Sequence, residues 1–324
     1  MAELRGILES RQVSIYFAAV ASAALIALTA GGTDALETSI NPALAAMLFL
    51  TFLQVPLADL GQAFGHGRFL AALIVTNFVV MPLLVALLVQ LLPDDPMLRL
   101  GALLVLLSPC IDYVVTFSHL GRADARLLLA ATPVLLILQI LLLPVYLQIF
   151  LEPKVAELID AGPFVQAFVW LIAIPFAFAA LLQYWAARNS AAGRLSSILG
   201  LLPVPATAIV LFVVVAAVVP ELRPAIDKAL SVVPIYLGFA ILAPLIGWRI
   251  ARLFRLDAPA GRAVAFSAAT RNSLVILPLG LAIPGAVPVL PAIIVTQTLI
   301  ELLSELVYVR LMPKLSTGRE AEPA

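Results

Sequence analysis

Two polar clusters interrupt apolar stretches of the sequence and carry side chains that could do chemistry. Residues 108–119 include Cys110 and Asp112, and residues 267–278 include Arg271. Cys110 is the single cysteine of the chain, so an internal disulfide is excluded, and its thiol is a soft ligand once it ionises. A lone cysteine in a helix is otherwise a small buried apolar residue. We therefore take Cys110 as a candidate substrate ligand, with simple burial as the alternative.

Asp112 and Arg271 are the ionisable members at the centres of the two clusters. Each follows a serine by four residues, so we expect them to occupy equivalent positions. Ionisable side chains within apolar segments generally face one another or a cavity. We therefore expect Asp112 to face Arg271 and to take up and release protons, which would couple transport to protons. A static ion pair that holds two helices together is the alternative.

Further polar side chains in apolar surroundings complete the candidate site. The predicted substrate-binding residues are Cys110, Asp112, Thr116, Asn77, Asn272 and Ser273, and the predicted coupling residues are Asp112, Arg271 and Glu301. Gln297, Glu301 and Glu305 recur every four residues, so they share one helix face that must contact protein or water. For Asn77 and Glu301, hydrogen bonds that only pack helices together are an equally good interpretation.

The sequence lacks the common motifs of catalysis, cofactor binding and metal binding. It contains no Gly-x-Ser-x-Gly elbow, no phosphate-binding glycine loop ending in Lys-Ser/Thr and no His-Glu-x-x-His pair. We therefore expect a protein that is not an enzyme and that has no cofactor, no resident metal ion and no nucleic-acid partner.

The elements that must position these residues are membrane-spanning helices. Hydrophobic residues make up 63% of the 324 residues, charged residues only 12%, and the mean hydropathy is +1.11. Soluble domains are about 45–50% apolar, so most side chains of this chain must contact a lipid bilayer. The predicted spans are residues 14–30, 40–60, 68–92, 98–119, 125–150, 163–187, 198–219, 231–249, 262–283 and 287–311.

Ten spans divide into two sets of five, residues 1–152 and residues 153–324. An odd number of spans in each set inverts the second set relative to the first, which is typical of secondary transporters. The fourth and ninth spans then correspond, and the polar cluster in each should break its helix. We expect an all-α polytopic protein of two inverted five-helix repeats, in which the broken fourth and ninth helices cross.

Lysine and arginine are unevenly distributed between the loops on the two sides of the membrane. The loops on the side of Met1 carry most of them, including Arg122, Arg252 and Arg310, whereas the first and ninth connections carry none. Positively charged loops remain in the cytoplasm. Both termini should therefore be cytoplasmic, in a plasma membrane of the bacterial inner-membrane type.

Three segments carry a resemblance to a known superfamily. They are residues 77–83 (NFVVMPL), residues 108–124, which open with Ser-Pro-Cys, and residues 268–273 (AATRNS). The chain resembles the superfamily of bile acid:sodium symporters, arsenite efflux permeases and riboflavin transporters over essentially all ten spans. The Pro-Cys pair is similar to the arsenite permease branch, in which the cysteine at the place of Cys110 is regarded as essential. The resemblance implies a panel domain and a core domain, assembled from both halves, that move against each other to give alternating access.

The resemblance and the residues together predict a secondary active transporter. Sodium symporters of the superfamily rely on an acidic residue in the ninth span, whereas this chain has Arg271 in that region, and a fixed cation should repel sodium. We therefore expect proton-coupled efflux of arsenite or a similar thiophilic metalloid oxyacid bound by Cys110. The alternative is a sodium- or proton-coupled transporter of a small organic anion.

Overall fold

The computed structural model describes residues 2–30, 32–54, 65–111, 113–151, 166, 169–281, 283 and 289–315. Within these ranges the regular structure is helical, as the sequence predicts, and one isolated antiparallel bridge joins Pro109 to Arg271. Asp112 lies outside the described residues. Its pairing with Arg271 therefore stays a prediction.

The chain folds into two compact units, each assembled from three separate segments. Unit 1 comprises Met1–Leu57, Leu158–Ala229 and Leu277–Val295, and unit 2 comprises Ala58–Glu157, Leu230–Ile276 and Thr296–Ala324. Both units take segments from either side of residue 152, where the sequence divides into its two predicted repeats. The repeat boundary itself stays a prediction.

Unit 1 contains helices from the start and the middle of the chain. They are α1 (Ala2–Thr29), η1 (Thr33–Leu36), α2 (Glu37–Phe52), η4 (Val169–Ala173), α11 (Ile174–Ala186), α12 (Ser190–Leu199), α13 (Pro203–Val218) and η5 (Val219–Glu221). Many of their outward apolar side chains are exposed, including Leu25 and Leu28 of α1. Such exposure is favourable where the surrounding solvent is lipid.

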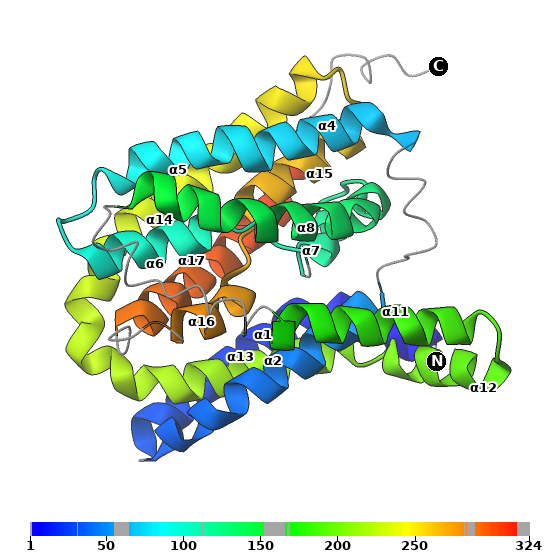
Figure 1. The fold of residues 1–324 in the computed structure, drawn as a ribbon, viewed down its shortest axis with the longest axis horizontal. Helices are drawn as coiled ribbons and strands as arrows, with labels where there is room; N and C mark the ends of the chain where they lie inside the picture. Colours follow the sequence, from blue (N-terminus) through cyan, green and yellow to red (C-terminus); the bar gives the residue numbers. More distant parts are fainter. Residues whose placement is uncertain are drawn as a thin grey trace. The chain divides into compact units, whose positions relative to one another are not determined.

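Unit 2 contains the segments that carry the predicted site. They are α4 (Gly67–Val75), η3 (Thr76–Val80), α5 (Met81–Val89), α6 (Pro96–Leu106), α7 (Val114–Leu120), α8 (Ala125–Phe150), α15 (Ala258–Ala269) and η6 (Met312–Lys314). Three further helices, α14 (Leu222–Leu253), α16 (Ser273–Leu281) and α17 (Val289–Leu311), have residues in both units. Figure 1 shows α4, η3 and α5 following one another as a single rod.

Among the described residues, five helices are long and apolar enough to cross a membrane, or seven if each of two bent pairs counts as one span. The predicted span 125–150 coincides with α8. The predicted spans 98–119 and 262–283 are not single helices, because each is interrupted in its middle and leaves short pieces such as Pro96–Leu106. The helices agree with an integral membrane protein, whereas the number of ten spans stays a prediction.

Two prolines within long helices free a backbone carbonyl, and a tyrosine binds each one. Pro82 has no N–H to donate to the carbonyl of Phe78, four residues earlier, and that oxygen instead accepts from the Tyr146 hydroxyl at 2.5 Å. Pro244 of α14 frees the carbonyl of Ala240 in the same way, and the Tyr308 hydroxyl donates to it. Tyrosine and carbonyl are 68 residues apart in both cases. Both prolines are thereby accommodated inside apolar surroundings.

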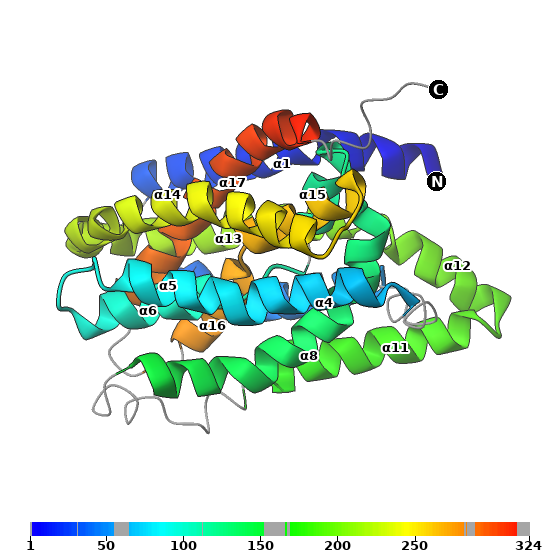
Figure 2. The same cartoon turned by 90° about the horizontal axis from the view of Figure 1, so that it is seen from above.

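All residues of α15 except Pro259 are buried, and glycines let the neighbouring helix α14 approach closely. A Cβ atom on Gly247 of α14 would lie 2.7 Å from the Cβ of Ala268 and 3.1 Å from the Cα of Ala265. On Gly261 it would lie 2.7 Å from the Trp248 ring. Figure 2 shows α14 and α15 side by side. Small residues at this contact fix the position of the helix that ends at the second break.

Candidate functional site

Both predicted helix breaks are present, and their backbones pair with each other. The first break separates α6 from α7, and the second separates α15 from α16. Pro109 and Arg271 form the antiparallel bridge between them. The N–H of Cys110 donates to the carbonyl of Thr270 at 3.1 Å, and the N–H of Asn272 donates to that of Ser108 at 2.8 Å. Each break thus satisfies backbone groups that the other leaves without a helical partner.

The chain around the two breaks has matching local structure. Asp95 and Asp257 each cap the helix that leads into a break, through a carboxylate that accepts from backbone N–H groups. Ser108 and Thr270 each donate their hydroxyl to the carbonyl four residues earlier, at 2.8 Å in both cases. The members of each pair are 162 residues apart (270 − 108 = 162). The second break therefore repeats the structure of the first.

The backbone bridge gives Arg271 a partner that the sequence does not suggest. Counting four residues from Ser108 and from Ser267 makes Asp112 equivalent to Arg271, and this equivalence stays a prediction because Asp112 lies outside the described residues. The structure places Pro109 and Arg271 opposite each other, 162 residues apart (271 − 109 = 162). Backbone hydrogen bonds set this register, and the shared spacing from a serine plays no part in it.

The Arg271 side chain is fully buried and lies among oxygen atoms at the ends of two helices. Its Nη2 donates to the carbonyls of Ser267 at 2.7 Å and Ala268 at 2.6 Å, in the last turn of α15. Its Nη1 donates to the carbonyl of Leu106, the last residue of α6, at 3.2 Å. The guanidinium carbon lies 5.2 Å from the centre of the Phe239 ring. The charge is thus held by carbonyl dipoles and an aromatic face.

Asn77 is fully buried in η3, a π-helical turn, and contacts Arg271 directly. Its Oδ1 accepts from Nη2 of Arg271 at 3.0 Å. Its Nδ2 donates to the Ser267 hydroxyl at 2.9 Å and to the carbonyl of Leu73 at 3.1 Å. The sequence indicated Asn77 as a site residue. It did not indicate that the partner of Asn77 is Arg271, which is 194 residues away. Turns of the π type are frequent at functional sites.

Glu301 of α17 joins the same cluster through both carboxylate oxygens. Its Oε2 accepts from the backbone N–H of Arg271 at 2.7 Å and from Nε2 of Gln297 at 2.6 Å. The Tyr113 hydroxyl donates toward Oε1 and also lies 3.2 Å from the carbonyl oxygen of Arg271. The Ser273 hydroxyl donates to Oε1 of Gln297. Sequence reasoning assigned no role to Tyr113, although it follows Asp112 directly in the first cluster.

Glu305 lies one turn beyond Glu301 and is also fully buried. The sequence predicts that this face of α17 contacts protein or water, and the structure shows protein, since Gln297, Glu301 and Glu305 are 4%, 3% and 0% exposed. The Thr270 hydroxyl lies 2.6 Å from Oε1 of Glu305 and 2.8 Å from the Phe266 carbonyl. Oε2 of Glu305 has no hydrogen-bond partner among the described residues. A protonated Glu305 would satisfy Thr270 by donating to its hydroxyl.

The remaining predicted residues lie at or beside the paired breaks. Cys110 is fully buried, and Asn272 occupies the equivalent place in the second break (272 − 110 = 162). Asn272 is 1% exposed, and its side-chain nitrogen and oxygen have no partner within the described part of the chain. Thr116 is half-buried in α7 and lies outside the network that joins Asn77, Arg271 and Glu301.

A small cavity of about 10 Å³ adjoins this network within unit 2. It is lined by Glu301, Gln297, Tyr236, Tyr308 and six further residues of α6, α14, α15 and α17. The Tyr236 hydroxyl is buried and has no partner among the described residues. The cavity has about the volume that one water molecule needs.

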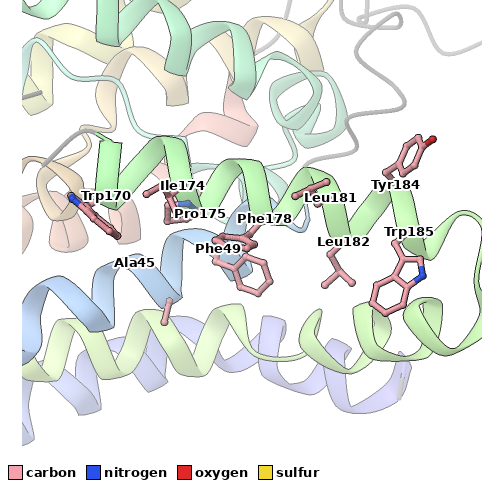
Figure 3. A pocket seen from close by; sticks show the side chains of 11 residues that line it. Ala45, Phe49, Trp170, Ile174, Pro175, Phe178, Leu181, Leu182, Tyr184 and Trp185 are labelled. Carbon is pink, nitrogen blue, oxygen red and sulfur yellow. The ribbon is translucent and has the colours of Figure 1, made fainter. Parts of the chain in front are cut away.

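A larger groove, of about 890 Å³, lies between α2 and α11 of unit 1. Figure 3 shows Phe178 and Trp185 of α11 on the side of that helix that faces α2, near Phe49, with Trp170 of the preceding η4 at the end of the groove. The eleven lining residues are apolar or aromatic, and none is a predicted site residue. Specific binding sites need a few placed polar groups. The paired breaks of unit 2 are therefore the better candidate site.

The apolar helices and the buried polar residues that they surround are those of an integral membrane protein. The model of the sodium bile acid symporter family matches residues 41–223, which is more than half of the chain. The chain belongs to this family, whose members are transporters and not enzymes. No curated protein matches the chain.

Proposed function

We propose that this protein is a proton-coupled secondary transporter that exports arsenite or a similar thiophilic metalloid oxyacid. The observation that carries the proposal is the position of Cys110. The only thiol of the chain is fully buried where the two helix breaks pair. Broken helices in matching positions are typical of substrate sites in secondary transporters. Trivalent arsenic prefers sulfur ligands, so a thiol at this place matches that cargo.

The chemistry at Cys110 is a reversible exchange of ligands on arsenic. The thiol replaces one hydroxyl of arsenous acid, so that one S–As bond forms and one water molecule leaves, and hydrolysis reverses the step. A single sulfur ligand gives a weaker attachment than several, which suits a carrier that must release its cargo. Asn272 supports the proposal because its buried amide has no partner among the described residues and could bind a hydroxyl of the oxyacid.

Glu301 is our proposed site for the coupling proton, together with the predicted site at Asp112. The Tyr113 hydroxyl has one hydrogen and lies near two acceptors, Oε1 of Glu301 and the Arg271 carbonyl. When Glu301 is ionised, the hydroxyl donates to the carboxylate. When Oε1 carries a proton, Glu301 donates to Tyr113, which is then able to donate to the carbonyl of Arg271. Protonation thus alters a hydrogen bond at the centre of the paired breaks.

We also propose the inverted repeat that the sequence predicts, with both termini cytoplasmic in a bacterial-type inner membrane. Support comes from the matching breaks, and from the tyrosines that bind the carbonyls freed by Pro82 and Pro244. The predicted core domain would correspond to unit 2 and the panel domain to unit 1. Movement of one domain against the other would then expose the site to either side of the membrane in turn.

A small organic anion is the second candidate cargo, and the description of the family favours it. The sequence predicts that the positive charge of Arg271 attracts such an anion. In the structure, Nη1 and Nη2 already donate to four oxygens, and only Nε has no partner among the described residues. Few donors remain for an anion, so the metalloid is our first choice.

Transport into everted membrane vesicles tests the proposal. Wild-type vesicles should accumulate arsenite and antimonite when a proton gradient is imposed, and the Cys110→Ser variant should lose at least about 90% of this uptake. A matched control moves the thiol to the half-buried Val115 in the Cys110→Ser background, and uptake should remain lost. Uptake of small carboxylates that survives in Cys110→Ser would favour the organic anion. Stimulation by a sodium gradient alone would refute proton coupling.

A further inference from the structure

The environment of the Arg271 guanidinium resembles a binding site for a small monovalent cation. Four oxygens contact its terminal nitrogens: the carbonyls of Leu106, Ser267 and Ala268, and Oδ1 of Asn77. We call these four atoms the oxygen cage. All are neutral oxygens, and none of the guanidinium's partners among the described residues is a carboxylate. Backbone carbonyls at the ends of broken helices bind coupling cations in secondary transporters.

The cage includes an equivalent backbone carbonyl oxygen from the helix before each of the two breaks. Leu106 and Ala268 are 162 residues apart, the separation that relates the two breaks (268 − 106 = 162). Their carbonyls therefore occupy equivalent places at the carboxyl ends of α6 and α15. Each end of an α-helix carries about half an elementary charge, negative at the carboxyl end. Two such ends match one positive charge, which the guanidinium supplies.

The cage is closed to solvent. Arg271 is 0% exposed, and both Asn77 and Ser267 are fully buried as well. Asn77 is held in place by two further hydrogen bonds, from its Nδ2 to Ser267 and Leu73. The oxygens therefore cannot turn away to water when the guanidinium is removed. Their negative potential would remain inside an apolar protein, at a high electrostatic cost.

We infer that the Arg271 guanidinium is a tethered cation, and that a chain without it contains a vacant cage that binds a small monovalent cation. The positive charge is then a permanent part of the wild-type protein and does not exchange with ions in solution. Arg271→Ala removes the guanidinium and leaves the four oxygens in place. Guanidinium, sodium or potassium from solution should then fill the cage. The inference is independent of the cargo, because it concerns a cation and not the transported substrate.

Thermal unfolding of purified protein tests this inference without any transport substrate. Wild type and Arg271→Ala are heated in choline chloride of constant ionic strength, with guanidinium, sodium or potassium replacing part of the choline at millimolar concentrations. At least one of these cations should raise the Tm of Arg271→Ala in a saturable manner, by about 2 °C or more. The Tm of wild type should not distinguish these ions from choline.

Arg262 provides the matched control. It lies on α15, the helix that leads into the break at Arg271, and it is buried. It donates to the carbonyls of Arg122 and Leu315 and to none of the four oxygens of the cage. The Tm of Arg262→Ala should not depend on which cation is present. If no cation stabilises Arg271→Ala more than choline does, or if all three proteins respond alike, the inference is wrong.

A second pair of variants decides the matter if Arg271→Ala does not fold. Arg271→Lys keeps a positive charge near the cage, whereas Arg271→Met has similar length and no charge. If the four oxygens form a cation site, the Tm of Arg271→Lys should be higher than the Tm of Arg271→Met. Equal Tm values, or a higher value for Arg271→Met, would overturn the tethered-cation assignment.

Discussion

Pro109 and Arg271 face each other in an antiparallel bridge that joins two interrupted helices. Proline has no N–H to donate and breaks a helix, so its neighbours need partners outside their own helix. The backbone of the second break supplies them at Thr270 and Asn272. The same pairing brings the Arg271 side chain to the carboxyl ends of both α6 and α15. One contact therefore holds the broken backbone together and positions the charge of the site.

Replacing Tyr113 by phenylalanine should impair proton coupling. The change removes the hydroxyl that lies between Glu301 and the Arg271 carbonyl. We expect a loss of about 1–3 kcal/mol in the free energy of unfolding, because buried hydrogen-bonding groups lose a partner. Uptake into vesicles should respond much less to an imposed proton gradient. Tyr236→Phe is the control, since its hydroxyl has no partner among the described residues, and it should leave stability nearly unchanged. Equal effects of the two variants would count against the role of Tyr113.

Replacing Glu301 by glutamine should separate exchange of cargo from proton-driven transport. Glutamine keeps the shape of a protonated carboxyl group but cannot release a proton. We expect Glu301→Gln to exchange labelled for unlabelled cargo while losing net uptake driven by a proton gradient. Glu305→Gln is the comparison, because a neutral amide can donate to Thr270 as a protonated Glu305 would. Full proton-driven uptake by Glu301→Gln would exclude Glu301 as the proton site.

Replacing Asn77 by leucine should be strongly destabilising. Asn77 bonds to Arg271, Ser267 and Leu73, and leucine leaves buried polar groups without partners. We expect a loss of about 3 kcal/mol in the free energy of unfolding, measured by denaturation in detergent. Thr76→Val in the same π-helical turn removes one bond to Ala72 and should cost no more than about 1 kcal/mol. A smaller loss for Asn77→Leu than for Thr76→Val would contradict this account.

A methyl group at Gly247 should disturb the position of α15. The added Cβ would approach Ala268 and Ala265 of that helix to 2.7 and 3.1 Å, so the helices must separate. Overpacking of this kind costs about 1–3 kcal/mol, and the Tm of Gly247→Ala should fall accordingly. Gly238→Ala on the same helix is the control, because its Cβ would lie 3.6 Å from Leu88 in ordinary contact. Unchanged stability of Gly247→Ala would show that this contact is not tight.

Local properties of the sequence were sufficient to predict helices, their breaks and several candidate residues. Apolar runs predicted α8 with its bounds, because a long helix in lipid needs only a continuous apolar segment. Pro109 and the polar residues around it located the first break. The spacing of Gln297, Glu301 and Glu305 predicted a shared face in contact with protein or water, because helix geometry places residues four apart on the same side. The structure buries this face.

The partners of these residues were decided only by the tertiary structure. The sequence indicated that Asp112 and Arg271 are equivalent, whereas the structure pairs Arg271 with Pro109 and surrounds its guanidinium with backbone carbonyls. Every residue has the same backbone carbonyl group, so the residue types in the sequence do not show which carbonyls will bind a charged side chain. Asn77 and Arg271 are 194 residues apart, and only helix packing brings them within 3.0 Å. Such contacts depend on how helices dock, which local composition does not determine.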